Sequence, residues 1–92
     1  MSFEWDPEKA ASNLLAHGVG FAEAVTAFED DFALFREDPT SVGEKRFVIL
    51  GLSDQANLLV VVFAFREPDT VRLISAWKAN KRQRQQYEKG RG

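Results

Sequence analysis

The chain has 92 residues, enough for one domain, and 45% of them are hydrophobic, so a small core can form without cross-links. It contains no cysteine, which excludes disulfides and zinc–thiolate sites. The N-terminal segment is acidic, unlike a signal peptide, and the longest apolar run, Leu58 to Phe65, is too short to span a membrane. We therefore expect a cytoplasmic protein whose residues 1–92 form a single domain.

The positive charge is concentrated near the C-terminus, although the formal net charge is -2. Residues 72–92 carry seven Lys or Arg and one acidic residue, whereas residues 1–71 carry five basic and thirteen acidic residues. This segregation predicts binding of a polyanion, such as RNA or DNA, or of an acidic protein partner. A basic terminal helix that is simply solvated explains the same pattern, and composition alone leaves both interpretations open.

Two helices are predicted in the first third of the chain. Asp6 is a suitable N-cap, Pro7 suits the first helical position, and Gly18 can end the helix in a left-handed conformation. Between them, apolar residues recur at helical spacing: Ala10, Ala11, Leu14 and Leu15. A second, shorter helix is predicted from Phe21 to Phe28.

The middle of the chain predicts four strands, because β-branched and aromatic residues dominate there. The predicted strands are Phe32–Arg36, Arg46–Leu52, Leu58–Arg66 and Val71–Trp77. Their connections are short, so we expect an antiparallel meander. In the last strand, alternation places Val71, Leu73 and Ser75 on one face of the sheet, and Arg72, Ile74 and Ala76 on the other.

A polar helix is predicted to close the chain. Asn80 as N-cap, with Gln83 three residues later, matches the capping-box pattern. The residues that follow are almost all polar, and Tyr87 is the one large anchor. The predicted order is therefore α-α-β-β-β-β-α, an α+β fold in which helices pack on an antiparallel sheet.

The usual catalytic patterns are missing from the sequence. It contains no Ser/His/Asp arrangement, no paired carboxylates at catalytic spacing and no glycine-rich phosphate loop, and we expect neither a metal nor a cofactor. The single histidine, His17, cannot build a multi-histidine metal site. Its place before Gly18 suits a cation that interacts with the last carbonyl groups of a helix.

The start of the last helix is a candidate anion site. Free backbone N–H groups and the helix dipole favour an anion there. The cations Lys81, Arg82 and Arg84 are unfavourable at this end by about 0.3–1 kcal/mol each, and a bound phosphate would compensate for them. Arg66 and Arg72, on the preceding strands, would add further cations.

Each candidate also has a purely structural explanation. Arg66 can cover a strand edge, and Gln83 can act as a helix cap. Tyr87 can anchor the helix to the core instead of serving as a general acid. Trp77 can pack within its strand or offer a ring on which a base stacks.

Several short motifs spread over nearly the whole chain resemble those of the BrnT family. At the N-terminus these are Phe3-Glu4-Trp5-Asp6, Lys9-Ala10, Asn13, His17-Gly18-Val19 and Phe21-Ala22-Glu23-Ala24. Further on they are Glu44-Lys45-Arg46-Phe47, Ile49, Gly51, Leu58-Leu59-Val60-Val61, Arg72-Leu73-Ile74-Ser75-Ala76, Arg84 and Tyr87.

The resemblance implies a toxin of a type II toxin–antitoxin pair. BrnT proteins are ribonucleases with a RelE-like compact fold, and they arrest growth by cleaving cellular RNA. A BrnA antitoxin with a DNA-binding domain neutralises each of them. We therefore expect an RNA substrate, a BrnA-like partner and a toxin homodimer within the complex.

The resemblance also implies site residues. Carried over position by position, it implies that Arg66, Arg72, Lys78, Arg82, Arg84 and Tyr87 are active residues. Taking this with the residues themselves, we expect Arg66, Arg72, Lys78, Arg82, Gln83 and Tyr87 to be catalytic, and Lys81, Arg84 and Trp77 to bind RNA. The chain departs from the family at two positions, where Trp77 replaces Arg and Gln83 replaces Glu. Glutamine keeps the capping hydrogen bond but cannot accept a proton, so the second departure predicts weakened activity if that Glu is a general base.

The expected chemistry is metal-independent RNA cleavage, in which a 2′-hydroxyl group attacks the neighbouring phosphate. Arg66, Arg72 and Arg82 would stabilise the charge that grows on the phosphate. Lys78 or Tyr87 would transfer protons, and His17 would do so if the fold brings it beside the basic helix.

Two other classes of function remain open from sequence. The first is a catalytically weakened or inactive module that binds RNA or an antitoxin. The second is a structural protein whose basic helix docks an acidic partner. Binding without cleavage would identify the first class, and a lack of any affinity for RNA would identify the second.

Overall fold

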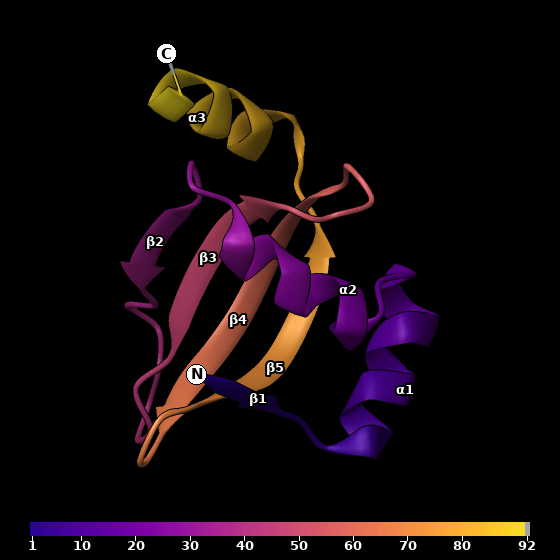
Figure 1. Cartoon of the computed structure of the whole chain (residues 1–92), viewed down its shortest axis with the longest axis vertical. Helices are drawn as coiled ribbons and strands as arrows, with labels where there is room; N and C mark the ends of the chain where they lie inside the picture. Colours follow the sequence, from indigo (N-terminus) through magenta and orange to yellow (C-terminus); the bar gives the residue numbers. More distant parts are fainter. Residues whose placement is uncertain (92) are drawn as a thin grey trace.

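A five-stranded sheet with helices on both faces forms the framework of the protein (Figure 1). The structure, a computed structural model, describes residues 1–91. The strands are β1 (Ser2–Glu4), β2 (Leu34–Glu37), β3 (Phe47–Leu52), β4 (Leu58–Arg66) and β5 (Thr70–Lys78), in the spatial order β1-β5-β4-β3-β2. The helices are α1 (Pro7–His17), α2 (Phe21–Thr26), the 3₁₀ turn η1 (Ala27–Glu29) and α3 (Lys81–Arg91). The predicted α+β class is confirmed.

The predicted order and the predicted purely antiparallel sheet are wrong at the N-terminus. Residues Ser2–Glu4 form an additional strand, β1, which pairs in parallel with β5 and places Phe3 opposite Val71. All other strand pairs are antiparallel. A strand of three residues shows almost no periodicity, and its partner lies nearly seventy residues away. Local sequence patterns therefore could not reveal it.

The first helix forms as its capping residues predict. The Asp6 carboxylate accepts the Glu8 N–H at 2.9 Å, and Gly18 adopts a left-handed conformation with φ 69°. The second predicted helix is shorter than expected, because η1 follows α2 directly. This turn crosses β3 so closely that a Cβ on Gly51 would lie 2.7 Å from the Ala27 carbonyl oxygen.

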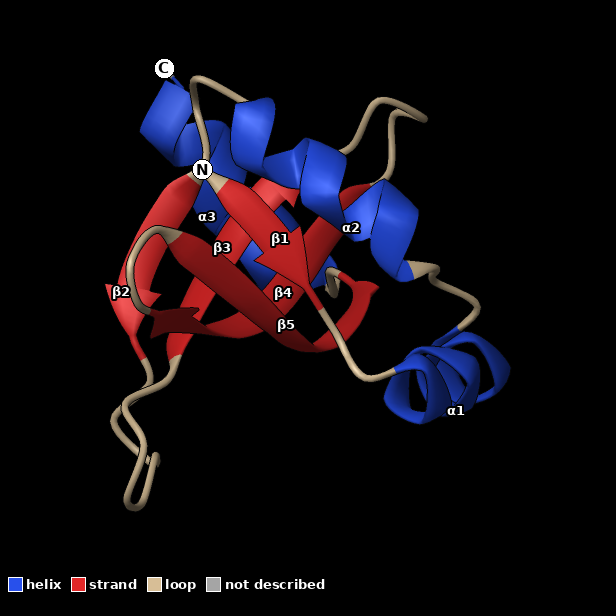
Figure 2. Cartoon of the chain, turned by 60° about the horizontal axis from the view of Figure 1, so that its bottom comes forward, coloured by secondary structure: helices blue, strands red, loops and turns tan. Residues whose placement is uncertain are grey.

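The two faces of the sheet carry separate apolar cores. Figure 2 shows the sheet and its helices from a second direction. The larger core lies beneath α1 and α2 and includes Phe21, Leu59 and Phe63. The smaller core lies on the opposite face beneath α3, and its buried residues are Leu50, Leu58, Val60 and Tyr87. Successive residues of β4 alternate between the two cores, so this strand is buried on both faces.

A β-bulge changes the predicted faces of β5. Val62 pairs with Ser75, whereas the next residue of β4, Phe63, pairs with Leu73, so Ile74 is an extra residue in β5. The prediction that Ser75 shares a face with Leu73 is therefore wrong, and Ala76 joins Leu73 in the larger core instead. A bulge moves every later residue to the opposite face, and regular alternation cannot anticipate it.

Asn13 of α1 completes the edge of the sheet beyond the end of β1. Its side chain is buried, and its amide nitrogen donates to the carbonyl oxygens of Ala76 at 2.8 Å and Val19 at 3.0 Å. Its amide oxygen accepts the Ala76 N–H at 3.1 Å and the Ser75 hydroxyl at 3.1 Å. Asn13 thus bonds the backbone of β5 as a neighbouring strand would, and it joins α1 to the sheet.

Within residues 1–91, no helix has the length and apolar character needed to cross a membrane.

We expect Asn13→Ala to lower the free energy of unfolding by about 1–3 kcal/mol, because it leaves the buried N–H and C=O groups of Ala76 without partners. Urea denaturation followed by circular dichroism measures the change. Leu15→Ala is the control, because Leu15 lies on the same helix and is 91% exposed. Equal stability of Asn13→Ala and the unmodified chain would contradict the role of Asn13.

Candidate functional site

Helix α3 is attached to the sheet through Tyr87. This side chain is buried, and its hydroxyl donates to a carboxylate oxygen of Asp30 at 2.6 Å. The same oxygen accepts the Leu52 N–H at 2.8 Å, and the other oxygen accepts the Phe32 N–H at 2.9 Å. Asp30 therefore joins α3 to the end of β3 and to the turn that precedes β2. The expectation that Tyr87 is a core anchor is confirmed.

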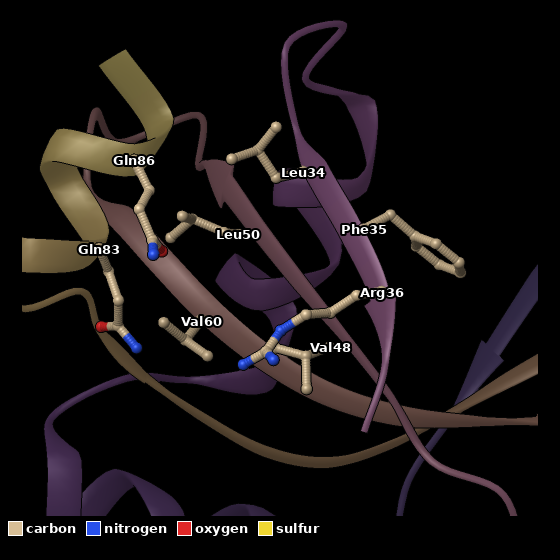
Figure 3. A pocket seen from close by; sticks show the side chains of 8 residues that line it. All are labelled: Leu34, Phe35, Arg36, Val48, Leu50, Val60, Gln83 and Gln86. Carbon is tan, nitrogen blue, oxygen red and sulfur yellow. The ribbon is translucent and has the colours of Figure 1, made fainter. Parts of the chain in front are cut away.

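The capping box at the start of α3 is also confirmed. The Gln83 side-chain oxygen accepts the Asn80 N–H at 2.9 Å, and the Asn80 side-chain oxygen accepts the Gln83 N–H at 2.8 Å. The cap uses the oxygen of the Gln83 side-chain amide and leaves its nitrogen available. Figure 3 shows the amide nitrogen on the side of Gln83 that faces Val60 and Arg36.

A pocket of about 130 Å³ lies between α3 and the sheet. Its lining residues are Leu34, Phe35 and Arg36 of β2, Val48 and Leu50 of β3, Val60 of β4, and Gln83 and Gln86 of α3. In Figure 3 the Arg36 guanidinium extends over Val48 and Val60 toward Gln83, whereas the Phe35 ring points away. An aliphatic floor with one guanidinium and two amides suits a flat ligand with a polar edge.

Arg36 is a site residue that sequence reasoning missed. It is exposed, and it lies opposite Val48 in the β2–β3 pair, on the same face of the sheet as the pocket. Among residues 1–91 no acidic side chain forms a salt bridge with it. The available signal was the alternation of Leu34 and Arg36 in a short strand. Four residues are too few for this alternation to establish a strand and its faces, so the signal is weak.

Asp38 is an acidic group near Arg36. Hydrogen bonds from the backbone N–H and the hydroxyl of Thr40 lower the pKa of Asp38, and the charges of Arg36 and Arg46 lower it further. The two bonds are 2.9 Å and 2.7 Å long. Asp38 is therefore ionised at neutral pH, and its charge partly offsets the positive potential around Arg36.

The structure places Arg66 and Arg72 on the pocket face but outside the pocket lining. Arg66 forms an ion pair with Glu44, and Arg72 donates to Glu4 at 2.8 Å. Alternation along β4 puts Arg66 on the same face as Val60, and Arg72 lies opposite Ala64. Val48 of the pocket lining pairs with Val62, and Arg66 lies four positions further along β4, or about 13 Å. The structure does not bring these two cations together with α3.

None of the cations of α3 whose side chains the structure describes, Lys81, Arg82, Arg84 and Lys89, lines the pocket. Arg82 lines an open hollow on the outside of the helix with Gln85, Gln86, Glu88 and Lys89. Lys81 and Arg84 are likewise exposed. The residues of α3 on the side of the sheet are Gln83, Gln86, Tyr87 and Gly90. Gln86 lines both the pocket and the outer hollow, and Gly90 lies against Leu34. The basic charge of α3 is thus an outer surface next to the pocket.

Trp77 and His17 lie together at the edge of β5. Trp77 is half-buried and packs against the core beneath α3, as its structural explanation predicts. Its ring centroid is 6.0 Å from that of His17. Lys78 is exposed, and it lies opposite Leu59, whose side chain belongs to the other core. Neither His17 nor Lys78 lines the pocket.

In the part of the chain that the structure describes, no three acidic or histidine side chains lie close enough together to hold a metal ion.

Comparison with known proteins gives a matching family model and a similar fold. A sequence model described as "Ribonuclease toxin, BrnT, of type II toxin-antitoxin system" matches residues 5–83. The crystal structure of the ribonuclease toxin BrnT from Brucella abortus is similar in fold, with a TM-score of 0.66 and 22% sequence identity. The similarity covers 88% of this chain and 99% of the Brucella chain. Curated protein sequences give no match.

We expect Tyr87→Phe to weaken the attachment of α3 by about 1.5–3 kcal/mol, because it removes a hydrogen bond to a charged group. Hydrogen exchange of the α3 amides should become faster, whereas the amides of β4 keep their protection. Arg84→Ala, on the exposed side of α3, is the control. Unchanged exchange in Tyr87→Phe would show that the Asp30 bond does not hold the helix.

Proposed function

The chain belongs to the BrnT family of ribonuclease toxins of type II toxin–antitoxin systems. We propose that it binds and cleaves RNA on the face of the sheet that α3 covers. One observation carries the proposal. The exposed Arg36 guanidinium and the Gln83 amide face each other across an apolar floor, directly beneath a basic helix. Cations and amide groups are the side chains that bind RNA phosphates, riboses and bases.

We propose metal-independent cleavage through attack by the 2′-hydroxyl group on its own 3′-phosphate. The hydroxyl must lose a proton as the new P–O bond forms, and the leaving 5′-oxygen must gain one. Gln83 lies where a proton acceptor would be useful, but an amide cannot take up a proton at neutral pH. The reaction in this chain is therefore slow unless another group, or water, accepts the proton.

Capping and catalysis are compatible roles for the side chain at position 83. The cap requires one acceptor atom, which the Gln83 oxygen supplies to the Asn80 N–H. A glutamate would keep that bond with one oxygen and present its second oxygen where the amide nitrogen now faces the pocket. The same side chain would then both start the helix and accept the proton.

Arg66 and Arg72 are proposed to bind the RNA backbone along the same face. Each is paired with a surface carboxylate, and surface ion pairs of this kind contribute little stability. A phosphate group can therefore displace Glu44 or Glu4. The outer cations Lys81, Arg82 and Arg84 would contact phosphates where the RNA leaves the pocket, with Trp77 as a stacking surface at the edge.

Lys78, Tyr87 and His17 have weaker support as proton-transfer groups, because none of them lines the pocket.

The partner is proposed from the family. Type II systems pair a toxin with a protein antitoxin, so this chain has an antitoxin partner. We propose that the partner is BrnA-like, with a DNA-binding domain, and that the toxin is a homodimer within a cytoplasmic complex. A relationship of the fold to RelE is proposed on the same resemblance.

A catalytically weakened module is the second candidate function. Gln83 and Trp77 favour it, because both replace ionisable residues that the family usually has at these positions. Such a protein would bind RNA or the antitoxin and cleave little.

We expect Gln83→Glu to accelerate RNA cleavage by at least about 100-fold, the lower end of what a positioned general base contributes. Growth and total RNA integrity after induced expression, together with cleavage by the purified protein, measure the effect. Gln85→Glu is the matched control, because it makes the same charge change two residues away on the outside of α3. Equal rates for the two variants would contradict a catalytic role for position 83.

We expect Arg66→Ala and Arg72→Ala each to reduce the salt dependence of RNA binding. The slope of the logarithm of the binding constant against log[salt] is negative, and each lost phosphate contact should reduce its magnitude by about 0.7 for single-stranded RNA. Anisotropy of a labelled, 2′-O-methylated RNA at several KCl concentrations gives the slope. Lys9→Ala, on α1, should leave it unchanged. An unaltered slope in both arginine variants would remove these residues from the RNA-binding face.

A further inference from the structure

We propose that the pocket beneath α3 is a base-recognition subsite, which holds one nucleobase from the bound RNA whose major-groove edge offers a carbonyl acceptor and no amino donor, namely guanine or uracil. The inference rests on the proposed ribonuclease function and adds the sequence preference that this function would show. It concerns the nucleotide whose 2′-hydroxyl attacks, so cleavage would follow a guanosine or a uridine.

The size and floor of the pocket suit a single ring system. Its volume is about 130 Å³, and its floor consists of Val48, Leu50 and Val60 on adjacent strands. An apolar protein cavity of about 150 Å³ is known to bind benzene. Side chains of neighbouring strands form a broad surface on which the flat face of a base can lie, with its polar edge toward β2 and α3.

The polar groups around this floor are mostly donors. The Arg36 guanidinium can only donate hydrogen bonds. The Gln83 side-chain oxygen already accepts the Asn80 N–H, so the group that Gln83 offers to a ligand is its amide nitrogen, which also donates. Gln86 offers both a donor and an acceptor. A rim rich in donors complements guanine O6 and N7 or the uracil carbonyls. Adenine and cytosine fit less well, because each presents an amino donor on that edge.

A base explains the pocket better than a phosphate does. Arg36 is the single cation in the lining, and the floor beneath it is aliphatic. Placing a phosphate on this floor would remove its water without replacing the lost hydrogen bonds, which is costly for a charged group. The exposed cations on the outside of α3, the exposed Arg66 and the half-buried Arg72 offer better sites for phosphates. A base in the pocket would also place its own ribose beside Gln83.

Binding of five short oligonucleotides tests the subsite without depending on catalysis. One probe is a fully abasic 2′-O-methyl pentamer, and the other four carry a single central guanine, uracil, adenine or cytosine. We expect the guanine or the uracil probe to bind at least about five-fold more tightly than the adenine, cytosine and abasic probes, the lower limit for one good bidentate contact. The comparison between guanine and uracil identifies which base the pocket prefers.

The variants Arg36→Leu and Gln86→Leu should reduce that preference to less than two-fold. Both residues are exposed, so the fold should tolerate the changes. Gln85→Leu, which lies outside the pocket lining, should keep the preference. Equal binding of the abasic and base-containing probes, or an equal loss in Gln85→Leu, would overturn the proposal.

Cleavage of unmodified RNA, measured separately, distinguishes the two proposals. A chain that cleaves RNA but binds all five probes equally lacks the subsite and keeps the ribonuclease function. A chain that shows the base preference but cleaves nothing, even as Gln83→Glu, keeps the subsite and loses the proposed catalysis.

Discussion

The hydrogen bond between Tyr87 and Asp30 determines where α3 lies, and the candidate site depends on that position. Helix α3 has eleven residues and is strongly polar, and isolated helices of this length are marginal in water. Its stability must therefore come from contact with the rest of the fold. The buried Tyr87 ring supplies apolar contact, and its hydroxyl reaches a carboxylate that also accepts two backbone N–H groups. Without this anchor the pocket would lose Gln83 and Gln86.

The short edge strand β2 separates two surfaces of different chemistry. Phe35 points to one face and stacks on Phe47, with ring centroids 5.7 Å apart. Leu34 and Arg36 point to the other face, where Leu34 contacts the last turn of α3 and Arg36 lines the pocket. Alternation in a four-residue strand thus gives the protein an aromatic surface on one side and a cationic pocket on the other. The small core beneath α3 lies next to this pocket.

Features that depend on neighbouring residues could be predicted from the sequence. The caps of α1, the bounds of β4 and the reciprocal cap between Asn80 and Gln83 all follow from local rules, and the structure has them. The parallel strand β1 and the bulge at Ile74 could not be predicted, because each depends on pairing with a distant strand.

The site was harder to predict than the fold. The distribution of charge along the sequence identifies the basic helix, but it does not show in which direction the side chains point. Arg82 faces away from the sheet. Arg66 and Arg72 were expected beside the helix, whereas strand length keeps them at the far end of the same face. Arg36 enters the site only because β2 lies beside β3, a pairing across a long loop.

The central claim is that RNA binds on the α3 face, across the pocket that Arg36 and Gln83 line. Titration of the isotope-labelled protein with a short 2′-O-methylated RNA, followed by backbone amide chemical shifts, tests it most directly. The account predicts that the largest shifts occur in β2, in β3 and in the first two turns of α3. Shifts confined to α1 and α2, on the opposite face of the sheet, would contradict it.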